Sequence, residues 1–240
     1  MPNAQRPAAC RGHALESNTR LFASIRFVYD SRVKHVLMVA SAPWRWEEEF
    51  VALVRRADEV LAADGGANHL ARIGVLPAAV VGDLDSIRPS VRRWVGEDRI
   101  VSRPSQDATD LDKTLAFAFD ERGAGAVTVL AATGGRPDHA LENLSLLVRW
   151  SARGEVDGWD AAARIVPVRD RARLATTAGQ VVSLLPLGRT EKVWTEGLQW
   201  PLAGEALELA VRTSVHNVAT GEAFEVRVAG GALLVFLLRS

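Results

Sequence analysis

The chain has 240 residues, which is long enough for one large domain or two small ones with a buried core. Hydrophobic residues make up 48% and charged residues 24%, as is usual for a soluble globular protein. The 29 basic residues balance the 29 acidic ones, so the formal net charge is zero. Nothing in this total indicates a general nucleic-acid or membrane surface, and we expect neither as a partner.

The cysteine and histidine content limits the kinds of metal site. Cys10 is the single cysteine, so an intrachain disulfide and a cysteine-based metal cluster are excluded. The five histidines lack the spacing of zinc ligands, which leaves a hard cation as the default metal. No apolar run approaches the ~20 residues that span a bilayer, and the first residues contain no clean apolar signal region. We therefore expect a cytoplasmic location.

Residues 1–34 form a polar extension rich in proline, arginine and asparagine. Such a composition buries too little apolar surface to order itself. We expect a flexible tail or a weakly docked arm with no chemistry of its own.

From residue 35 onward, apolar runs alternate with helical patterns. The run 36–40 is apolar without alternation, which is typical of a strand covered on both faces. Repeated strand–helix units predict an α/β domain with a parallel sheet and right-handed crossovers. The expected strands are 36–40, 59–63, 78–81, 99–101, 126–131 and 163–168, and the expected helices are 46–57, 109–122 and 138–153.

Polar loops follow four of these strands, at 64–68 (DGGAN), 82–86 (GDLDS), 105–113 (SQDATDLDK) and 133–139 (TGGRPDH). In such sheets, ligands bind outside the carboxyl ends of the strands. Acids from several loops would converge there and repel one another unless a cation lies between them. This convergence predicts a metal and phosphate site, for which Mg²⁺ is a suitable hard cation.

Asp83 and Asp85 are the central pair of acids. On extended backbone their side chains would share one face, because side chains alternate along a strand. Two such carboxylates would bind Mg²⁺ together with substrate phosphates and water. A turn or a helix cap is the alternative for an isolated D-x-D.

Glycine pairs and basic residues accompany the acids. The pairs at 65–66 and 134–135 would let the backbone approach a ligand and present N–H groups to phosphate, although a tight turn is the alternative for 134–135. Arg136 offers a planar fork for phosphate oxygens, and Lys113 offers a point charge. The alternative for Lys113 is a solvated helix face near acidic neighbours.

Beyond about residue 170 the pattern changes to short β-rich runs separated by glycine, proline and asparagine turns, as in a β-sandwich. We therefore divide the chain into an α/β domain at 35–170 and an all-β sandwich domain at 171–240. The expected sandwich strands are 180–185, 192–195, 206–211, 223–228 and 232–237.

The order DGGAN, GDLDS, QDATDLDK and GGRPDH resembles the catalytic domain of bacterial-type thiamine pyrophosphokinases. These enzymes transfer a diphosphate from ATP to the hydroxyethyl oxygen of thiamine and release AMP. The resemblance implies an α/β domain followed by a β-sandwich. It also implies a homodimer with the site between protomers.

The resemblance implies roles for individual residues. Asp83, Asp85 and Arg136 would carry the catalysis, and we expect Asp83 to accept the hydroxyl proton. The acids that match the family's metal ligands are Asp64, Asp83, Asp85 and Asp110. Gln106 and Thr109 match its polar contacts to ATP, and Arg136 and Asp138 match the loop over the phosphates. The full set of residues that we expect to bind ATP is Asp64, Gly65, Gly66, Asn68, Gln106, Thr109, Asp110, Lys113, Gly135, Arg136 and Asp138.

The segment 197–202 (GLQWPL) resembles the part of the family whose aromatic residue packs on thiamine. An indole face suits a cationic thiazolium, although a buried core or interface tryptophan is the alternative for Trp200. Ser214 and Asn217 match a thiamine-site turn that usually reads Ser-x-Ser-Asn. His216 replaces the second serine of that turn, and an ordinary exposed turn residue is the simpler interpretation of it.

Transfer of this kind is catalysed mainly by positioning and charge neutralisation. We expect Mg²⁺ to bridge the ATP phosphates, so that the thiamine oxygen attacks the β-phosphorus in line with the departure of AMP, while Arg136 and Lys113 stabilise the developing charge. Two alternatives remain open: a diphosphokinase acting on another alcohol, such as a hydroxymethylpterin, and a non-catalytic sensor of thiamine or nucleotide.

Overall fold

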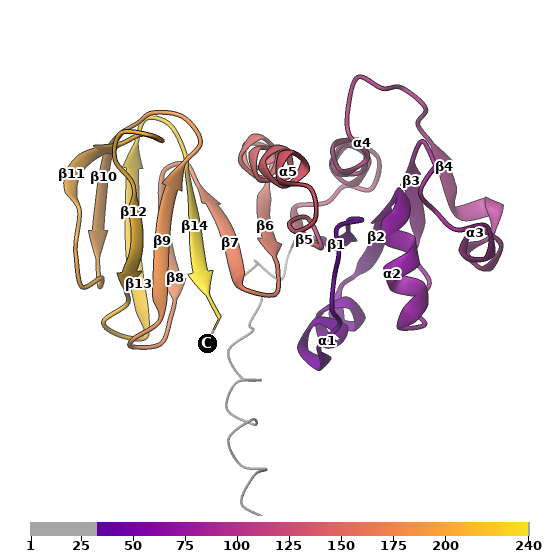
Figure 1. Cartoon of the computed structure of the whole chain (residues 1–240), viewed down its shortest axis with the longest axis horizontal. Helices are drawn as coiled ribbons and strands as arrows, with labels where there is room; N and C mark the ends of the chain where they lie inside the picture. Colours follow the sequence, from indigo (N-terminus) through magenta and orange to yellow (C-terminus); the bar gives the residue numbers. More distant parts are fainter. Residues whose placement is uncertain (1–32, 240) are drawn as a thin grey trace, which may run out of the picture.

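The computed structural model describes residues 33–239. The extension predicted for residues 1–34 therefore lies outside the described residues, apart from Val33 and Lys34. The described chain forms a mostly parallel sheet covered by helices, followed by a sandwich of antiparallel strands (Figure 1). The predicted fold class is confirmed.

Six parallel strands form the first part of the sheet, in the spatial order β6-β5-β1-β2-β3-β4. All five residues of β1 are buried, as the unbroken apolar run predicts for a strand with helices on both faces. The strands are β1 (His35–Val39), β2 (Glu59–Ala63), β3 (Ala79–Gly82), β4 (Ile100–Ser102), β5 (Ala126–Leu130) and β6 (Glu155–Trp159).

The helices cover the two faces of this sheet in separate groups. Leu37 and Val39 of β1 pack with the group α1, α2 and α3, and the alternate residues Val36 and Met38 pack with α4 and α5. The helices are α1 (Glu48–Arg56), α2 (Ala67–Arg72), α3 (Pro89–Val95), α4 (Asp110–Ala116) and α5 (Pro137–Trp150), with a π-helical turn η4 (Phe117–Glu121) after α4 and 3₁₀ turns η2 (Asp64–Gly66) and η3 (Glu97–Arg99). No described helix combines the length and the apolar character needed to cross a bilayer.

The same sheet continues into the C-terminal part of the chain. β7 (Ala163–Val168) pairs antiparallel with β6 on one side and with β14 (Leu233–Leu238) on the other. β9 (Val181–Pro186) and β12 (Ser214–Val218) extend it to ten strands. A four-stranded antiparallel sheet packs against this end, in the order β11 (Ala203–Leu207), β10 (Thr190–Glu196), β13 (Ala223–Ala229) and β8 (Arg171–Ala175).

A shared strand lies at the predicted domain boundary. β7 ends just before residue 170, yet its partner β14 comes from the last residues of the chain. The apolar core around α4 and α5 likewise includes Ile165 and Leu234 from these two strands. The division at residue 170 remains a prediction, and the backbone hydrogen bonds of the sheet run across it.

Several elements differ from the sequence prediction. The strands β6, β8 and β12 were not predicted, because polar or charged residues interrupt their apolar patterns. The strand predicted at 206–211 is wrong beyond Leu207, since Glu208 and Arg212 close a turn in which Ala210 has a left-handed φ of 63°. The helix predicted at 109–122 is α-helical only as far as Ala116 and continues as the π-helical turn η4.

Arg239, the last described residue, fastens the end of β14 to α1. Its guanidinium pairs with Glu49 and, at 2.7 Å, with Glu47, and it lies 4.6 Å from the centre of the Phe50 ring. The contacts connect the start of the first helix to the last strand of the sandwich.

Candidate active site

Three carboxylates meet at the carboxyl edge of the parallel strands. Asp64 follows β2, Asp83 follows β3 and Asp110 begins α4, and one oxygen from each lies within 4.8 Å of the others. We call these three residues the acid group. Acids from three of the four predicted loops therefore meet at this edge, whereas Asp138 of the fourth loop and the exposed Asp85 are not members of the acid group.

Asp64 organises the loop that carries the other acids. It is 2% exposed, and its two carboxylate oxygens accept hydrogen bonds from the backbone N–H groups of Ser86 (2.9 Å) and Ile87 (3.0 Å). Burial raises the pKa of Asp64, and repulsion from Asp110 and Asp85 raises it further, against the effect of the two hydrogen bonds. The crowding of negative charge at this carboxylate is what a bound cation would relieve.

The prediction that Asp83 and Asp85 share one face of an extended strand is wrong. Leu84 between them has a left-handed φ of 70°, which turns the chain so that the N–H of Asp85 donates to Oδ1 of Asp83 at 3.3 Å. The carboxylate of Asp85 instead accepts a hydrogen bond from the hydroxyl of Ser86 at 2.7 Å. This D-x-D motif is therefore a turn, which was the alternative interpretation. Asp83 nevertheless belongs to the acid group.

Gly82 gives the acids room to approach one another. A Cβ atom at this position would lie 2.9 Å from the Cβ of Asp64 and 2.9 Å from Oδ1 of Asp110. That same oxygen of Asp110 accepts a hydrogen bond from the N–H of Asp83 at 3.2 Å. A side chain at residue 82 would displace two of the three acids.

Lys113 and Gln106 contact the acid group directly. The ammonium of Lys113 donates to Oδ1 of Asp110 at 3.1 Å, and its side chain is only 8% exposed, so the solvated-face alternative is wrong. Gln106 donates to Oδ2 of Asp83 at 3.0 Å. This hydrogen bond lowers the pKa of Asp83, and the N–H of Asp85 and the charge of Lys113 lower it further.

Two of the predicted ATP contacts hold loops in place. The amide of Asn68 donates to the carbonyl of Ser86 and accepts from the N–H of Arg88, both at 3.0 Å. Thr109 caps α4, since its hydroxyl accepts a hydrogen bond from the N–H of Asp112 at 3.3 Å. Both side chains shape the rim on which the acids lie.

The two predicted glycine pairs are explained by tight packing and turning. A Cβ atom on Gly66 would lie 2.0 Å from the carbonyl oxygen of Val39, so η2 can pack on the end of β1 only without a side chain there. Gly134 and Gly135 both have left-handed φ values, 97° and 70°, as the tight-turn alternative requires. A Cβ atom on Gly65 would lie 3.2 Å from the Cβ atoms of both Ser41 and Ser86, which is closer than ordinary van der Waals contact.

Arg136 and Asp138 form an exposed ion pair at the start of α5. The guanidinium donates to both carboxylate oxygens, at 3.1 and 2.5 Å, and the two side chains are 72% and 62% exposed. The hydrogen bond from Arg136 lowers the pKa of Asp138 to about 2. No hydrogen bond or ion pair between described residues joins this pair to the acid group.

The loop after β1 also borders the site, although none of its residues was predicted to do so. A Cβ atom on Gly65 would lie 3.2 Å from the Cβ of Ser41, and one on Gly135 would lie 3.0 Å from the ring of Pro43, so this loop runs between the two glycine turns. His69 donates from Nε2 to the carbonyl of Ala42 at 2.9 Å and holds the loop from α2. The proline just after the first predicted strand was the available signal.

Trp200 lies on the connection between β10 and β11 and is 57% exposed. The alternative that Trp200 is a buried core residue of this chain is therefore wrong. Ser214 and Asn217 lie on β12, a bulged strand rather than the predicted turn. The N–H of Gln199 donates to the carbonyl of Val218 at 2.8 Å, which brings the Trp200 segment beside β12. The three predicted thiamine residues are therefore neighbours.

The acid group and Trp200 are far apart within one chain. β3 and α4, which carry the acids, lie toward one end of the long axis, and β10 and β11 lie at the other (Figure 1). One molecule does not bring these two sets of residues into a single cleft.

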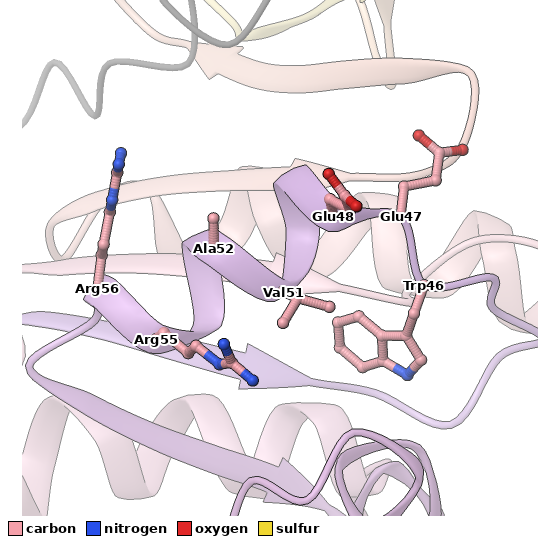
Figure 2. Close-up of a pocket in the computed structure, with 7 residues that line it drawn as sticks. All are labelled: Trp46, Glu47, Glu48, Val51, Ala52, Arg55 and Arg56. Carbon is pink, nitrogen blue, oxygen red and sulfur yellow. The ribbon is translucent and has the colours of Figure 1, made fainter.

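Two hollows among the described residues do not enclose the acid group. One of about 600 Å³ runs along the outer side of α1 (Figure 2). All its lining residues come from one stretch, namely Trp46, Glu47, Glu48, Val51, Ala52, Arg55 and Arg56. A second, of about 370 Å³, lies beside α4 and α5 and reaches Lys113. None of the residues that line the hollow along α1 belongs to the predicted site.

Comparison with known proteins identifies the family. Residues 50–156 match the family model of the thiamin pyrophosphokinase catalytic domain, and residues 166–233 match that of the thiamin pyrophosphokinase vitamin B1 binding domain. The chain belongs to the thiamine pyrophosphokinase family. Together the two family models match well over half of the chain, so the resemblance drawn from the four motifs is confirmed.

Individual members of the family show the same similarity. Thiamine pyrophosphokinase 1 of Oryza sativa subsp. japonica is 27% identical over 82% of this chain and 81% of its own length. Thiamine pyrophosphokinase 1 of Arabidopsis thaliana is 28% identical over 69% of this chain and 73% of its own length. The crystal structure of thiamine pyrophosphokinase from Bacillus subtilis has the same fold, with a TM-score of 0.75 at 22% identity over 86% of this chain and 100% of that one.

Proposed function

We propose that the protein is a thiamine diphosphokinase, which transfers the diphosphate of ATP to the hydroxyethyl oxygen of thiamine and yields thiamine diphosphate and AMP. The observation that carries the proposal is the acid group: three carboxylates from three loops, with oxygens within 4.8 Å, in a chain that also matches a vitamin B1 binding domain. Carboxylates crowded in this way suit a metal–phosphate centre.

The acid group fits Mg²⁺. Its donors are all carboxylate oxygens. Burial, together with repulsion from Asp110 and Asp85, raises the pKa of Asp64, and a bound cation would offset both effects. Asp64, Asp83 and Asp110 would hold the ion, and Asp85 remains a proposed fourth ligand because its repulsion is felt at Asp64. When bound, the ion would supply neutralisation of the phosphate charge of ATP.

The protein's own residues would position ATP and stabilise the developing charge. Lys113 is already at the acid group, and Arg136 is exposed at the start of α5, where it is free to turn from Asp138 to a phosphate. Asp83 is our candidate for the acceptor of the thiamine hydroxyl proton, since it is more accessible than the buried Asp64. The remaining proposed ATP contacts are Gly65, Gly66, Asn68, Gln106, Thr109, Gly135 and Asp138.

We also propose that thiamine stacks on Trp200 and that the enzyme is a homodimer. The separation of Trp200 from the acid group within one chain supports a site completed by a second copy (Figure 1). Leu209, Val211 and Val215 of the sandwich are 43%, 76% and 54% exposed, in addition to Trp200, and large exposed apolar side chains suit an interface. The cytoplasmic location and the absence of nucleic-acid and membrane partners remain predictions from composition.

The alternatives are less well supported. The match to a vitamin B1 binding domain argues against a diphosphokinase for another alcohol. The acid group argues against a sensor, because binding alone does not require a metal–phosphate centre. The deciding experiment is AMP release from purified protein given ATP and Mg²⁺, with and without thiamine, with the product identified by mass. Thiamine-dependent AMP together with thiamine diphosphate supports the proposal. A folded protein that binds ATP but releases no AMP with thiamine contradicts it.

A further inference from the structure

Asn217 connects the inside of the sandwich to Trp200. Its side chain is buried, at 2% exposure, and it binds both backbone groups of Trp200: Oδ1 accepts from the N–H at 3.1 Å and Nδ2 donates to the carbonyl at 2.6 Å. We propose that Asn217 is a positioning residue, which holds the indole of Trp200 in place for the substrate and does not itself contact it. The proposal rests on the proposed function, in which thiamine stacks on Trp200.

All the hydrogen-bonding capacity of Asn217 is already used. Oδ1 also accepts from the N–H of Val218 at 2.9 Å, and Nδ2 also contacts the hydroxyl of Ser214 at 3.4 Å. A primary amide has two donor hydrogens and an oxygen that accepts two bonds, so the four contacts complete it. The orientation of the amide is determined by its partners, because the reverse orientation would place the NH₂ group against two N–H donors. No polar atom is left for a ligand.

A β-bulge turns Asn217 inward. Along the pairing of β12 with β9, Ser214 lies opposite Leu184 and Asn217 lies opposite Val182, so β12 contains one extra residue. His216 lies in this bulge with a left-handed φ of 60°, and its N–H donates to the hydroxyl of Ser183 at 3.1 Å. Val215 and His216 are exposed in succession, which breaks the alternation and brings the next side chain to the buried face.

The position of the indole depends on this backbone attachment. The ring makes no aromatic or cation–π contact with another described residue, and 57% of the side chain is exposed. The flanking segment is fixed separately, by the bridge between Leu198 and Ala219 and by the N–H of Leu202 bonded to Thr195 at 2.8 Å. Removing the amide of Asn217 would therefore release Trp200 while leaving its neighbours attached.

A double-mutant cycle on thiamine binding tests the proposal. Dissociation constants would be measured by calorimetry for the wild type, Asn217→Ala, Trp200→Ala and the double variant. We expect Asn217→Ala to weaken binding about tenfold and Trp200→Ala at least as much. The double variant should bind like Trp200→Ala alone, because Asn217 acts only through the tryptophan. Additive losses, or unchanged binding in Asn217→Ala, would overturn the proposal.

Gln180→Ala is a matched control in the same sandwich. Gln180 is an amide residue that also binds two backbone groups, the carbonyl of Leu238 at 2.8 Å and the N–H of Thr177 at 3.3 Å, away from Trp200. Its loss should lower thermal stability but leave thiamine binding within about twofold. If Asn217→Ala fails to fold, Asn217→Asp keeps the acceptor for the N–H of Trp200 but places a second carboxylate oxygen against the carbonyl of Trp200, and it should likewise weaken binding.

A second readout separates this proposal from the proposed function. The indole N–H resonance of Trp200, assigned by its loss in Trp200→Ala, should shift or broaden in Asn217→Ala and remain unchanged in Gln180→Ala. If it does so in a protein that binds no thiamine, the proposed function fails and the positioning role stands. If Trp200→Ala weakens thiamine binding but Asn217→Ala changes neither the resonance nor the affinity, the positioning role fails.

Discussion

Lys113 donates a hydrogen bond to Asp110, with 3.1 Å between Nζ and Oδ1, although only 8% of the lysine side chain is exposed. Asp110 belongs to the acid group, so the protein itself supplies one positive charge to a cluster of three carboxylates. The same ammonium helps to lower the pKa of Asp83. The ammonium of Lys113 therefore lies next to the place where the acid group would bind a divalent cation, and the two positive charges would repel each other.

Replacing Lys113 with methionine should strengthen the binding of a divalent cation in the absence of nucleotide. Repulsion between a +1 and a +2 charge about 5 Å apart, even screened as in water, amounts to about 1.7 kcal/mol, so the affinity should rise by about twentyfold. Binding of Mn²⁺, followed by electron paramagnetic resonance, would measure this. AMP release should fall in the same variant, because the positive charge is lost from the proposed phosphate site.

The control for this experiment is Lys113→Arg, which keeps the charge and should leave the Mn²⁺ affinity close to that of the wild type. Weaker Mn²⁺ binding in Lys113→Met would contradict the competition between the ammonium and the cation.

Asp83→Asn should reduce AMP release by at least about a hundredfold while the fold is retained, because it removes a negative charge and a proposed metal ligand from the acid group. Asp85→Asn tests the fourth acid separately, and an equal loss of activity would support its place in the metal site. Asp107→Asn is the matched control. Asp107 is exposed on the same loop as Gln106, and among residues 33–239 its carboxylate accepts a hydrogen bond only from the hydroxyl of Ser105. Full turnover in folded Asp83→Asn would refute the role of the acid group.

Gly82→Ala should disrupt the acid group without removing an acid. The added Cβ would lie 2.9 Å from atoms of both Asp64 and Asp110, so the carboxylates must move apart. We expect weaker Mn²⁺ binding and slower AMP release. Gly74→Ala is the control, since Gly74 has a left-handed φ of 66° but nothing within 4 Å of the added atom, and its cost should be limited to about 1 kcal/mol of stability.

The ion pair of Arg136 and Asp138 gives a prediction for pH dependence. The hydrogen bond from Arg136 lowers the pKa of Asp138 from 3.8 to about 2. A carboxyl group whose pKa is lowered by folding contributes stability above its unfolded pKa, and that contribution is lost as the pH falls toward the folded value. The relevant window for Asp138 is thus from about pH 4 down to about pH 2.

Arg136→Gln should move the titration midpoint of the Asp138 carboxyl up toward 3.8, as measured by carbon NMR. The exposed Arg189, which pairs with Glu208 at 3.4 Å, provides the control variant Arg189→Gln, in which the Asp138 midpoint should not change. In the wild type, ATP binding should raise the midpoint if Arg136 turns to the phosphates. A midpoint that stays at about 2 in Arg136→Gln would show that another group stabilises the carboxylate.

The general position of the site was predictable from the sequence, because the ends of apolar strands can be located and the polar motifs follow them directly. The separation of the Asp83 and Asp85 side chains was not predictable. It depends on the left-handed backbone conformation of Leu84, and leucine rarely adopts that conformation. The burial of Lys113 was also unpredictable, because a charged residue near two acids is equally typical of a solvated helix face.

Two of the three strands that were not predicted, β6 and β12, lack a strand pattern in the sequence for the same physical reason. β6 contains Asp157 and Gly158, and β12 contains His216 and Asn217, so neither shows an apolar run or a clean alternation. Gly158 is needed because a Cβ atom there would lie 2.8 Å from Leu147 of α5. Tertiary contacts, which a local pattern does not contain, select the strand conformation in both cases.

The strand β7 hydrogen-bonds to β6 on one edge and to β14 on the other, and side chains from both halves of the chain fill one apolar core. A hinge between the halves would have to break those backbone bonds and open that core, so we expect the acid group and the sandwich of one chain to move as a rigid body. Closure over the proposed substrates would then be confined to the loops at the carboxyl edge and, in the proposed homodimer, to the approach of the second copy.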